Sequence, residues 1–357
     1  MKRKLLSAVL ATVMVASLVG CGGGGASAPA TSEPAAEEPA ADAGDAAEAE
    51  APAEAPAAEA GETKDLSELK LAFIVGTMND EFYQNVAKGI TTRCDELGIP
   101  APTVGDQELD GIICTNLVES YVSANYDAIA LSCNDKAGIV PAFQNANAAG
   151  VQMFTFDCTL DDQYADQYHA FVGTDNYAGG VVAGEYMLEV VPDGTKVGCI
   201  TYASAQSTQD RQRGFEETID AAIAGGKDIE RIETMDADND QAKATDIMNN
   251  WATKYGDELS YIFVVGDPTG YGALAAIKSA GAATKIIGFD ANATALDYIA
   301  SEDNGQIWVA DVAQDPVGIG SGIVDQMAEY FTTGAVTQQT NLISPALVTK
   351  DNVDDYR

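Results

Sequence analysis

The residues of this chain that could take part in binding or catalysis stand directly after apolar runs. They are Asn79, Asp80, Asp157, Asp267, Asp290 and Gln314. Carboxylates accept hydrogen bonds strongly, and amides both donate and accept, so such a set can bind the hydroxyl groups of a small ligand. An Asp after a strand can instead cap the next helix, a role that stays open for Asp267 and Asp290. Two acids could also hydrolyse a glycosidic bond, although the sequence does not give their separation.

Sites that depend on a metal ion are poorly supported. His169 is the only histidine, so a zinc cluster or a Cys-His pair would rest on one residue, and we expect a structural role for it. Residues 236–240 begin like a calcium loop, but Gln241 stands where Gly is required and Ile247 where the bidentate Glu belongs. The sequence therefore predicts no metal ion and no cofactor.

A nucleotide-binding motif also fails on its context. Residues 270–275 match the G-x-G-x-x-A fingerprint, and Asp290 lies 20 residues beyond Gly270. The phosphate turn should follow its strand directly, whereas residues 266–269 intervene here. We expect no dinucleotide site.

Short apolar runs alternate with segments of helical period from residue 69 onward. Strands are predicted at 71–75, 128–131, 151–156, 170–172, 197–201, 229–233, 261–265, 286–289 and 306–312. This alternation predicts parallel sheets with helices on both faces, and such sheets bind ligands beyond the carboxyl ends of their strands. Residues 66–357 are too many for one ordinary core and fit two lobes.

The N-terminus predicts export and membrane tethering. Residues 2–4 are basic, an apolar run covers 5–19, and Leu18-Val19-Gly20-Cys21 resembles the bacterial lipobox. We expect a signal peptide at 1–20 and lipid on Cys21. Residues 21–65 are rich in Ala, Pro, Gly and Glu, which predicts a disordered acidic stalk.

Composition limits the partners further. The formal net charge of −36 argues against nucleic acid and anionic lipid headgroups. Five cysteines remain after Cys21, an odd number without close pairs, which fits neither a disulfide framework nor a CxxC metal site. We expect buried thiols at Cys94, Cys114, Cys133, Cys158 and Cys199.

Residues 67–357 resemble the periplasmic sugar-binding proteins of the ribose- and galactose-binding type. The segment 74–83 is similar to the family's opening strand and loop, and 211–215 matches its Arg-x-x-Gly-Phe. Residues 287–290 and 312–314 keep its Gly-Phe-Asp and Ala-Gln. The resemblance implies a non-enzymatic receptor for a small sugar or sugar-like polyol.

By this resemblance, ten residues bind the ligand: Asn79, Asp80, Phe82, Tyr83, Asp157, Arg211, Asn239, Asp267, Asp290 and Gln314. In the family, the residue at the Asp80 position bonds sugar hydroxyls and the aromatic at the Phe82 position covers the sugar face. The first Arg of Arg-x-x-Gly-Phe, here Arg211, binds ring and anomeric oxygens. Acids, one Arg and aromatic rings suit a molecule with hydroxyls and apolar C–H faces.

Several positions differ from the ribose type. Asp80 stands where ribose-type members have Asn and galactose-type members have Asp. Cys158 replaces an Arg, Asn239 replaces the second stacking aromatic, and Gly266 stands where Asn is frequent. These differences favour a hexose over ribose, while a polyol or another carbohydrate stays open.

The resemblance also implies an α/β fold of two doubly wound parallel-sheet lobes joined by a three-strand hinge, the type I periplasmic-binding-protein fold. The first crossing is expected at 173–176. The N-terminal lobe would comprise 66–174 plus 315–343, and the C-terminal lobe 175–314 plus 344–357. The lobes would close over the ligand by hinge rotation.

We therefore expect a monomer, lipid-anchored outside the cytoplasm in the periplasm or on the outer face of the cell, that delivers its ligand to an ABC transporter permease. A sugar sensor for a chemoreceptor or sensor kinase is the alternative, and a hydrolase on the same fold is a third. A sugar-responsive repressor shares the fold, but residues 1–65 contain the signal and stalk in place of a DNA-binding helix-turn-helix.

Overall fold

The computed structural model describes residues 63–357. The predicted signal peptide at 1–20, Cys21 and all but the last three residues of the predicted stalk at 21–65 lie outside the described residues. The backbone N–H of Lys64 donates to the carbonyl of Phe331 at 2.8 Å, and its Nζ donates to Asp127 at 2.6 Å. The chain therefore contacts the folded domain from residue 64 onward.

The first lobe is built on six parallel strands in the order β12-β5-β4-β3-β1-β2. They are β1 Leu71–Val75, β2 Thr103–Asp106, β3 Ala128–Leu131, β4 Gln152–Phe156, β5 Phe171–Thr174 and β12 Thr340–Ile343. All residues of β1 and β3 are buried. This burial explains their uninterrupted apolar sequence, because a parallel sheet is covered on both faces.

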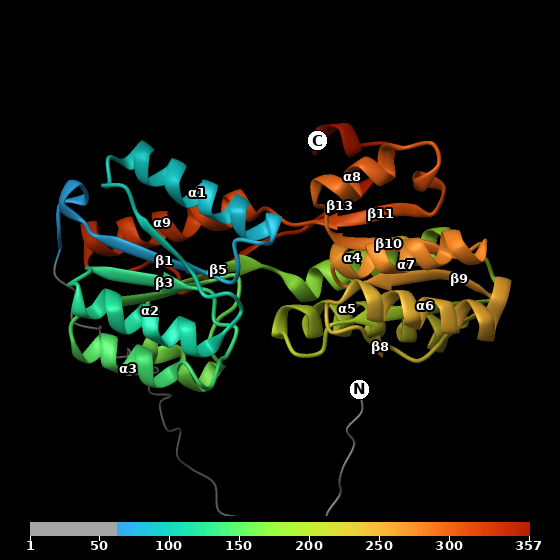
Figure 1. Ribbon diagram of the computed structural model, residues 1–357, viewed down its shortest axis with the longest axis horizontal. Helices are drawn as coiled ribbons and strands as arrows, with labels where there is room; N and C mark the ends of the chain where they lie inside the picture. The colour runs from blue at the N-terminus through green and yellow to red at the C-terminus, as the bar shows by residue number, and fades with distance from the viewer. Residues whose placement is uncertain (1–62) are drawn as a thin grey trace, which may run out of the picture. The chain divides into compact units, whose positions relative to one another are not determined.

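Helices pack on both faces of this sheet. They are α1 Glu81–Leu97, α2 Gly111–Ser123, α3 Val140–Ala148 and α9 Pro316–Thr333. α1 and α9 share one apolar core with the sheet, and α2 and α3 share another on the opposite face (Figure 1). The Asp80 side chain caps α1 by accepting the N–H of Phe82, and Gly98 ends that helix at φ 71°.

The second lobe is built on seven strands. Its order is β13-β11-β10-β9-β6-β7, with β8 beside β6, and every pairing is parallel except that of β11 with β13. The strands are β6 Thr195–Thr201, β7 Ile229–Arg231, β8 Met235–Asp236, β9 Leu259–Val264, β10 Lys285–Asp290, β11 Trp308–Ala313 and β13 Ala346–Thr349.

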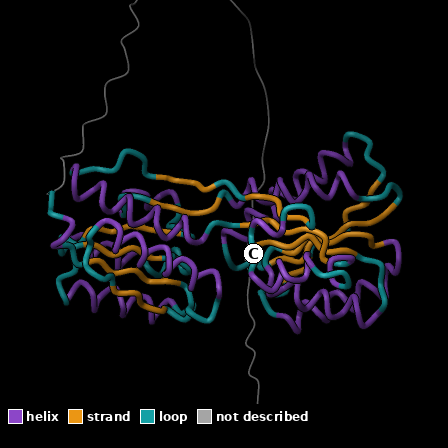
Figure 2. Tube along the Cα trace, turned by 90° about the horizontal axis from the view of Figure 1, so that it is seen from above, coloured by secondary structure: helices purple, strands orange, loops and turns teal. Residues whose placement is uncertain are grey.

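Five helices cover the second sheet: α4 Asn176–Val190, α5 Gln206–Ala224, α6 Gln241–Tyr255, α7 Asp267–Ala280 and α8 Ala293–Ala300. α4 and α5 share a core with one face, and the other three share a core with the opposite face. Figure 2 shows this layering as strands between helices. Short 3₁₀ helices occur at Leu66–Glu68, Asp162–Gln167, Gly256–Glu258, Asn304–Gln306 and Val353–Asp355.

The chain passes between the two sheets three times. It leaves the first sheet after β5, returns from β11 to α9, and crosses again between β12 and β13. The predicted α/β fold of two parallel-sheet lobes with three connections is confirmed. Only residues 344 and 345 separate β12 from β13, so the last crossing is short.

The glycine motif at 270–275 lies inside α7, which begins at Asp267. A Cβ at Gly270 would lie 2.4 Å from the Trp308 ring, so this glycine permits close packing of α7 on β11. His169 also has the expected structural role, because its Nε2 bonds Gln152 at 2.7 Å and its ring packs on Tyr330. Its surroundings contain no second histidine, since the sequence has only one.

The five described cysteines are all unpaired. Cys94, Cys114, Cys133 and Cys199 are buried, as predicted, whereas Cys158 is only half-buried. Burial raises the pKa of Cys94 to about 12, so that thiol stays protonated.

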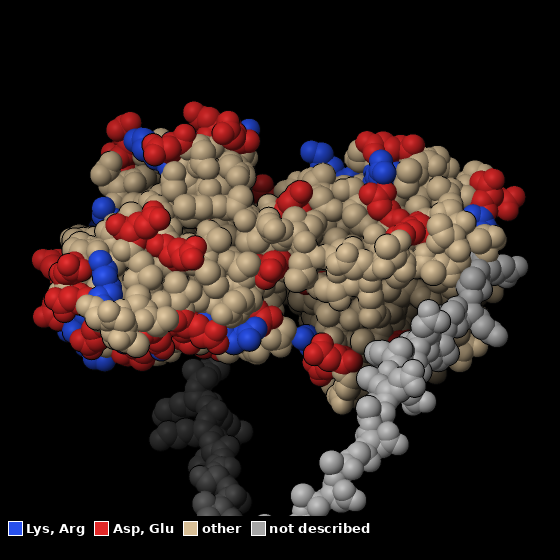
Figure 3. Space-filling view, turned by 180° about the vertical axis from the view of Figure 1, so that it is seen from behind, with Lys and Arg blue, Asp and Glu red and all other residues tan. Residues whose placement is uncertain are grey.

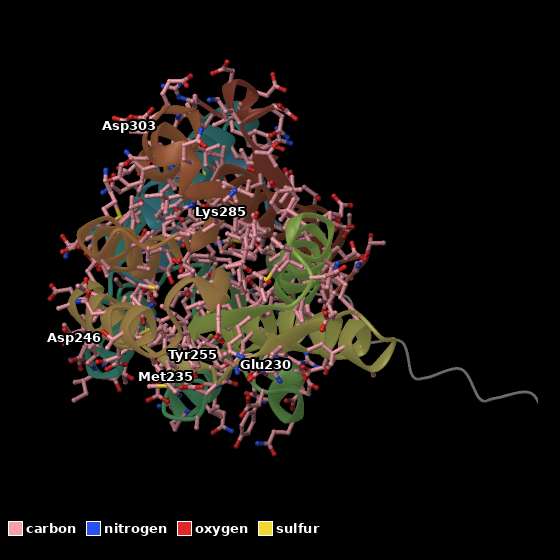
Figure 4. All side chains as sticks on the ribbon, turned by 90° about the vertical axis from the view of Figure 1, so that its right-hand side faces the viewer. Glu230, Met235, Asp246, Tyr255, Lys285 and Asp303 are labelled. Carbon is pink, nitrogen blue, oxygen red and sulfur yellow. The ribbon has the colours of Figure 1, made fainter. Side chains whose placement is uncertain are left out.

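The surface of the described residues carries many acids. Figure 3 shows Asp and Glu distributed over the visible face with Lys and Arg between them. In the end-on view, Asp246 and Asp303 lie at the edge of the molecule (Figure 4). Within residues 63–357, none of the helices has the length and apolar character needed to cross a membrane.

Helices α4 and α5 touch backbone to backbone. A Cβ at Gly180 would lie 2.0 Å from the carbonyl oxygen of Arg211, and one at Gly214 would lie 2.2 Å from that of Tyr177. The Gly of the Arg-x-x-Gly-Phe motif therefore lets α5 approach α4, and this approach fixes the position of Arg211.

We predict that Gly180→Ala lowers the free energy of unfolding by about 1–3 kcal/mol, because the added methyl overpacks a backbone contact. Urea denaturation measures the change. Gly322→Ala in α9 is the matched control, since its Cβ would meet no backbone atom and only the Val172 side chain, at 3.1 Å. That variant should stay within about 1 kcal/mol of the wild type. Equal losses in both variants would contradict the close-contact explanation.

Candidate ligand-binding site

A cavity of about 370 Å³ is lined by residues of both lobes. This volume is within the usual range for small-molecule sites, about 300–1,000 Å³. Eight of the ten predicted ligand residues line it: Asp80, Phe82, Tyr83, Asp157, Arg211, Asn239, Asp290 and Gln314. The other two are not among the lining residues, because Asn79 is exposed in the turn before α1 and Asp267 is fully buried at the start of α7.

Strand ends bring these residues together. Asp157 follows β4, Asp290 ends β10, and Gln314 follows β11. The carboxyl ends of parallel strands meet at one edge of each sheet, so residues far apart in sequence become neighbours there. Neither Asp267 nor Asp290 caps the next helix, since Gly266 and Asn292 occupy those cap positions.

Asp157 forms the polar centre of the first-lobe side. Its Oδ2 accepts the hydroxyls of Tyr83 and Ser132, each at 2.8 Å. Burial raises the pKa of Asp157, and these two hydrogen bonds oppose the rise. Burial, followed by the charge of Asp157, raises the pKa of Tyr83 well above its usual value, so the phenol stays a donor. The carboxylate keeps further lone pairs with which to accept ligand hydroxyls.

Arg211 forms the centre of the second-lobe side. Its NH1 donates to Oδ1 of Asp290 at 3.0 Å and to the carbonyl of Val265 at 2.8 Å. Its Nε donates to Asn176 at 2.8 Å, and the guanidinium lies 3.8 Å from the centre of the Phe289 ring. Within the described chain these bonds use Nε and NH1, which leaves the N–H groups of NH2 for a ligand.

Asp290 connects Arg211 to the hinge. Gln314 donates its Nε2 to Oδ1 of Asp290 at 2.7 Å, and Thr174 donates its hydroxyl to Oε1 of Gln314 at 2.6 Å. Thr174 and Gln314 stand at the first and second crossings between the sheets. Burial raises the pKa of Asp290 to about 6 against the opposing charge of Arg211, so the carboxylate is ionised at neutral pH.

The cavity also contains polar residues that the sequence analysis did not single out. They are Thr77, Asn134, Asp135, Lys136, Tyr202, Ser204, Gln206, Ser207, Thr208 and Gln209. Most of them follow β3 or β6. The rule that found Asp157 and Asp290, a polar residue just after an apolar strand, would have found these two segments as well.

Asp267 and Asp311 form a pair of fully buried acids beside Asp290. Burial, followed by the charges of the other two acids, raises the pKa of Asp267 well above its usual range. Burial also raises the pKa of Asp311 to about 7. The raised pKa keeps Asp267 protonated at neutral pH, and a protonated Asp267 can donate to the Asp311 carboxyl group, so the pair can share one proton.

Backbone and indole donors complete this pair. Asp267 accepts the N–H of Asn292 at 2.8 Å, and Asp311 accepts the N–H of Ala291 and the indole N–H of Trp308, both at 3.0 Å. The pair thus holds the turn that follows Asp290. In this geometry Asp267 supports the site and lies apart from the cavity lining.

The arrangement is suited to binding hydroxyl groups. Asp157, Arg211, Asp290 and Gln314 are held in place by protein partners and still have hydrogen-bonding capacity. Phe82 is mostly buried and adds an apolar surface to the cavity. In the part of the chain that the structure describes, no three His, Cys, Asp or Glu side chains cluster so as to hold a metal ion.

The family model described as the periplasmic binding protein domain matches residues 71–335. The chain belongs to this family. The match runs from β1 to the end of α9, and all ten predicted ligand residues fall within it.

Individual relatives agree with this assignment. The ribose import binding protein RbsB of Bacillus subtilis (strain 168) is 28% identical over 274 residues, which cover 76% of this chain and 85% of that protein. A solved structure of an ABC transporter solute-binding protein from Agrobacterium vitis with bound D-fucose is 28% identical, with a TM-score of 0.70 over 80% of this chain and 97% of that one. A periplasmic ribose ABC transporter structure from Conexibacter woesei DSM 14684 has a TM-score of 0.73 at 17% identity over 84% of this chain and 96% of that one, which shows the shared fold.

The acid pair predicts a pH dependence of stability. The pKa values of both Asp267 and Asp311 are raised in the folded protein, so their contribution to stability is fully present below their unfolded pKa of about 3.9 and falls as pH rises. The contribution of Asp311 is lost as pH rises through about 7. Asp267→Asn keeps one acceptor and one donor in the same places and does not titrate. We expect this variant to lose less stability than the wild type between pH 5 and pH 8 in urea denaturation.

Asp311→Asn is the matched comparison. Its amide would place a second donor against the N–H of Trp308 or of Ala291, so we expect a loss of about 1–3 kcal/mol at pH 5. Identical pH slopes for the wild type and Asp267→Asn would show that the two acids do not share a proton.

Proposed function

We propose that this protein is an extracytoplasmic solute receptor that captures a monosaccharide or sugar-like polyol in the cavity between its lobes. The observation that carries the proposal is the buried group of Arg211, Asp290 and Gln314 on the second-lobe side, facing the same cavity as Asp157 and Phe82. Acids and an Arg fork match hydroxyl groups, and a ring matches a C–H face.

The distribution of the site over two lobes supports capture by closure. The first lobe supplies Asp80, Phe82 and Asp157, and the second supplies Arg211 and Asp290. A ligand that bonds both groups favours the closed arrangement, and closure removes water from its hydroxyls. A ligand that lacks one matched hydroxyl would leave a buried polar group unpaired and would bind more weakly.

Within this class, we propose a hexose or hexose-like ligand. Asp80 agrees with the galactose type, while Cys158, Asn239 and Gly266 differ from the ribose type, and all four line the cavity. The Agrobacterium vitis structure contains D-fucose, other neighbours contain D-allose or myo-inositol, and the Bacillus subtilis relative is named for ribose. The neighbours' ligands are thus polyhydroxylated rings of related size.

We propose that the receptor acts in import and not in catalysis. The curated relative is named an import binding protein, and several structural neighbours are named ABC transporter solute-binding proteins. On this basis the closed receptor, as a monomer, would deliver its ligand to an ABC transporter permease. The lipobox-like sequence ending at Cys21 supports tethering to the outer surface of the membrane by lipid.

A thermal-shift panel of residues 63–357 with pentoses, hexoses and polyols tests the function. A ligand at about 100 times its dissociation constant should add about 2.7 kcal/mol of stability. Arg211→Lys keeps a positive charge near Asp290 but loses the planar fork, so we expect affinity to fall about tenfold or more. Isothermal titration calorimetry measures the loss.

Arg213→Lys is the matched control, because Arg213 lies two residues further along α5 and its side chain is 58% exposed beside Asp210. That variant should bind like the wild type. Equal losses in both variants would contradict the assigned role of Arg211, and no shift with any sugar would contradict the proposed function. Chemical change of a bound sugar after prolonged incubation would favour the hydrolase alternative.

A further inference from the structure

Two loops at the cavity, one in each lobe, have the same construction. We name residues 106–110 the first-lobe loop and residues 236–240 the second-lobe loop. In each loop the first Asp accepts the N–H of the residue two positions on, at 2.8 Å in both cases. In each, the last residue is an Asp that caps the following helix, α2 in one lobe and α6 in the other.

Their backbones correspond residue by residue. Gln107 and Ala237, the second residues, are buried and donate their N–H groups to the carbonyl oxygens of Val75 and Thr201. The third and fourth residues of both loops have left-handed backbones, with φ between 52° and 57°. Leu109 in the first lobe and Asn239 in the second therefore occupy equivalent positions.

Both of these equivalent residues line the cavity. The residues before them, Glu108 and Asp238, do not appear among its lining residues. The fourth residue of the loop therefore lines the cavity in each lobe, but the type of side chain differs between the two lobes. Asn239 provides an amide, whereas Leu109 provides an aliphatic side chain.

Local physics favours Asn at this position and disfavours Leu. Among residues with a side chain, Asn adopts the left-handed region readily, while the Cβ of a larger side chain crowds the backbone there. Leu109 is also 57% exposed, so burial within this structure does not compensate for its backbone conformation. Strain of this kind persists where function requires the side chain.

We propose that Leu109 is a further ligand-binding residue, which covers an apolar C–H edge of the bound ligand while Asn239 offers an amide from the equivalent position of the second lobe. This inference rests on the function proposed above. The ligand would then meet an apolar surface on the first lobe, made by Phe82 and Leu109, and mainly polar groups on the second. Leu109 becomes buried only when a ligand occupies the cavity, which accounts for its exposure without one.

Leu109→Asn tests the proposal because it copies the second-lobe residue into the first lobe. We expect the melting temperature of the ligand-free protein to stay the same or rise, since Asn fits the left-handed backbone. We expect affinity to fall about tenfold for each of D-fucose, D-allose, D-ribose and myo-inositol that the wild type binds, because the apolar cover is lost. Differential scanning fluorimetry and isothermal titration calorimetry give the two quantities.

Glu108→Asn is the matched control, with the same backbone conformation in the same loop but no place in the cavity lining. It should leave affinity unchanged. A lower melting temperature for Leu109→Asn would indicate a structural role and overturn the inference, as would an unchanged affinity. If the wild type binds none of the four sugars, the proposed function fails, and the inference about Leu109 fails with it. If the wild type binds a sugar and Leu109→Asn binds it equally well, only the inference about Leu109 is overturned.

Discussion

The buried ion pair between Arg211 and Asp290 is the interaction on which the site depends. A guanidinium or a carboxylate is costly to bury unless each has a charged or hydrogen-bonding partner in the right place. Here Asn176, Val265 and Gln314 supply those partners from elements far apart in sequence. The order of the strands in the second sheet and the close contact of α4 with α5 therefore both serve to keep these two charges satisfied.

Sequence patterns predicted the elements that bury apolar side chains on both faces. The runs at 71–75, 128–131 and 286–289 became central strands because each consists of residues that a covered parallel sheet must bury. The strands β2, β8, β12 and β13 were not identified. These four strands are short, partly exposed and poor in apolar runs. They are strands mainly because they form hydrogen bonds with an adjacent strand of the sheet, and the local sequence does not show which strand lies beside them.

The ligand-binding site likewise contains residues that the sequence could predict and residues that it could not. Asp157, Asp290 and Gln314 follow strands, and the topology that gathers strand ends could be inferred from alternation alone. Asp267 obeyed the same rule and yet lies buried against Asp311, because that partner stands 44 residues further on within an apolar strand. Spacing along the chain does not show which acids lie close together in the folded protein. The raised pKa values of Asp267 and Asp311 depend on that proximity and on burial, so the sequence alone could not predict them. Leu109 was missed for a related reason, since a left-handed backbone leaves no signature when the residue is not Gly or Asn.

Gln314 joins the cavity to the first crossing between the two sheets. It bonds Asp290 in the cavity and Thr174 at the first crossing, so it connects the cavity to the segments that pass between the sheets, about which the proposed closure would turn. In any rigid rotation, displacement grows in proportion to distance from the axis. In the proposed closure, a small shift at this glutamine would therefore accompany a larger displacement at the outer rims of the sheets. The closure proposed above would therefore combine a small movement at the cavity with a large one at the outer surfaces of the lobes, which are the surfaces that another protein can contact.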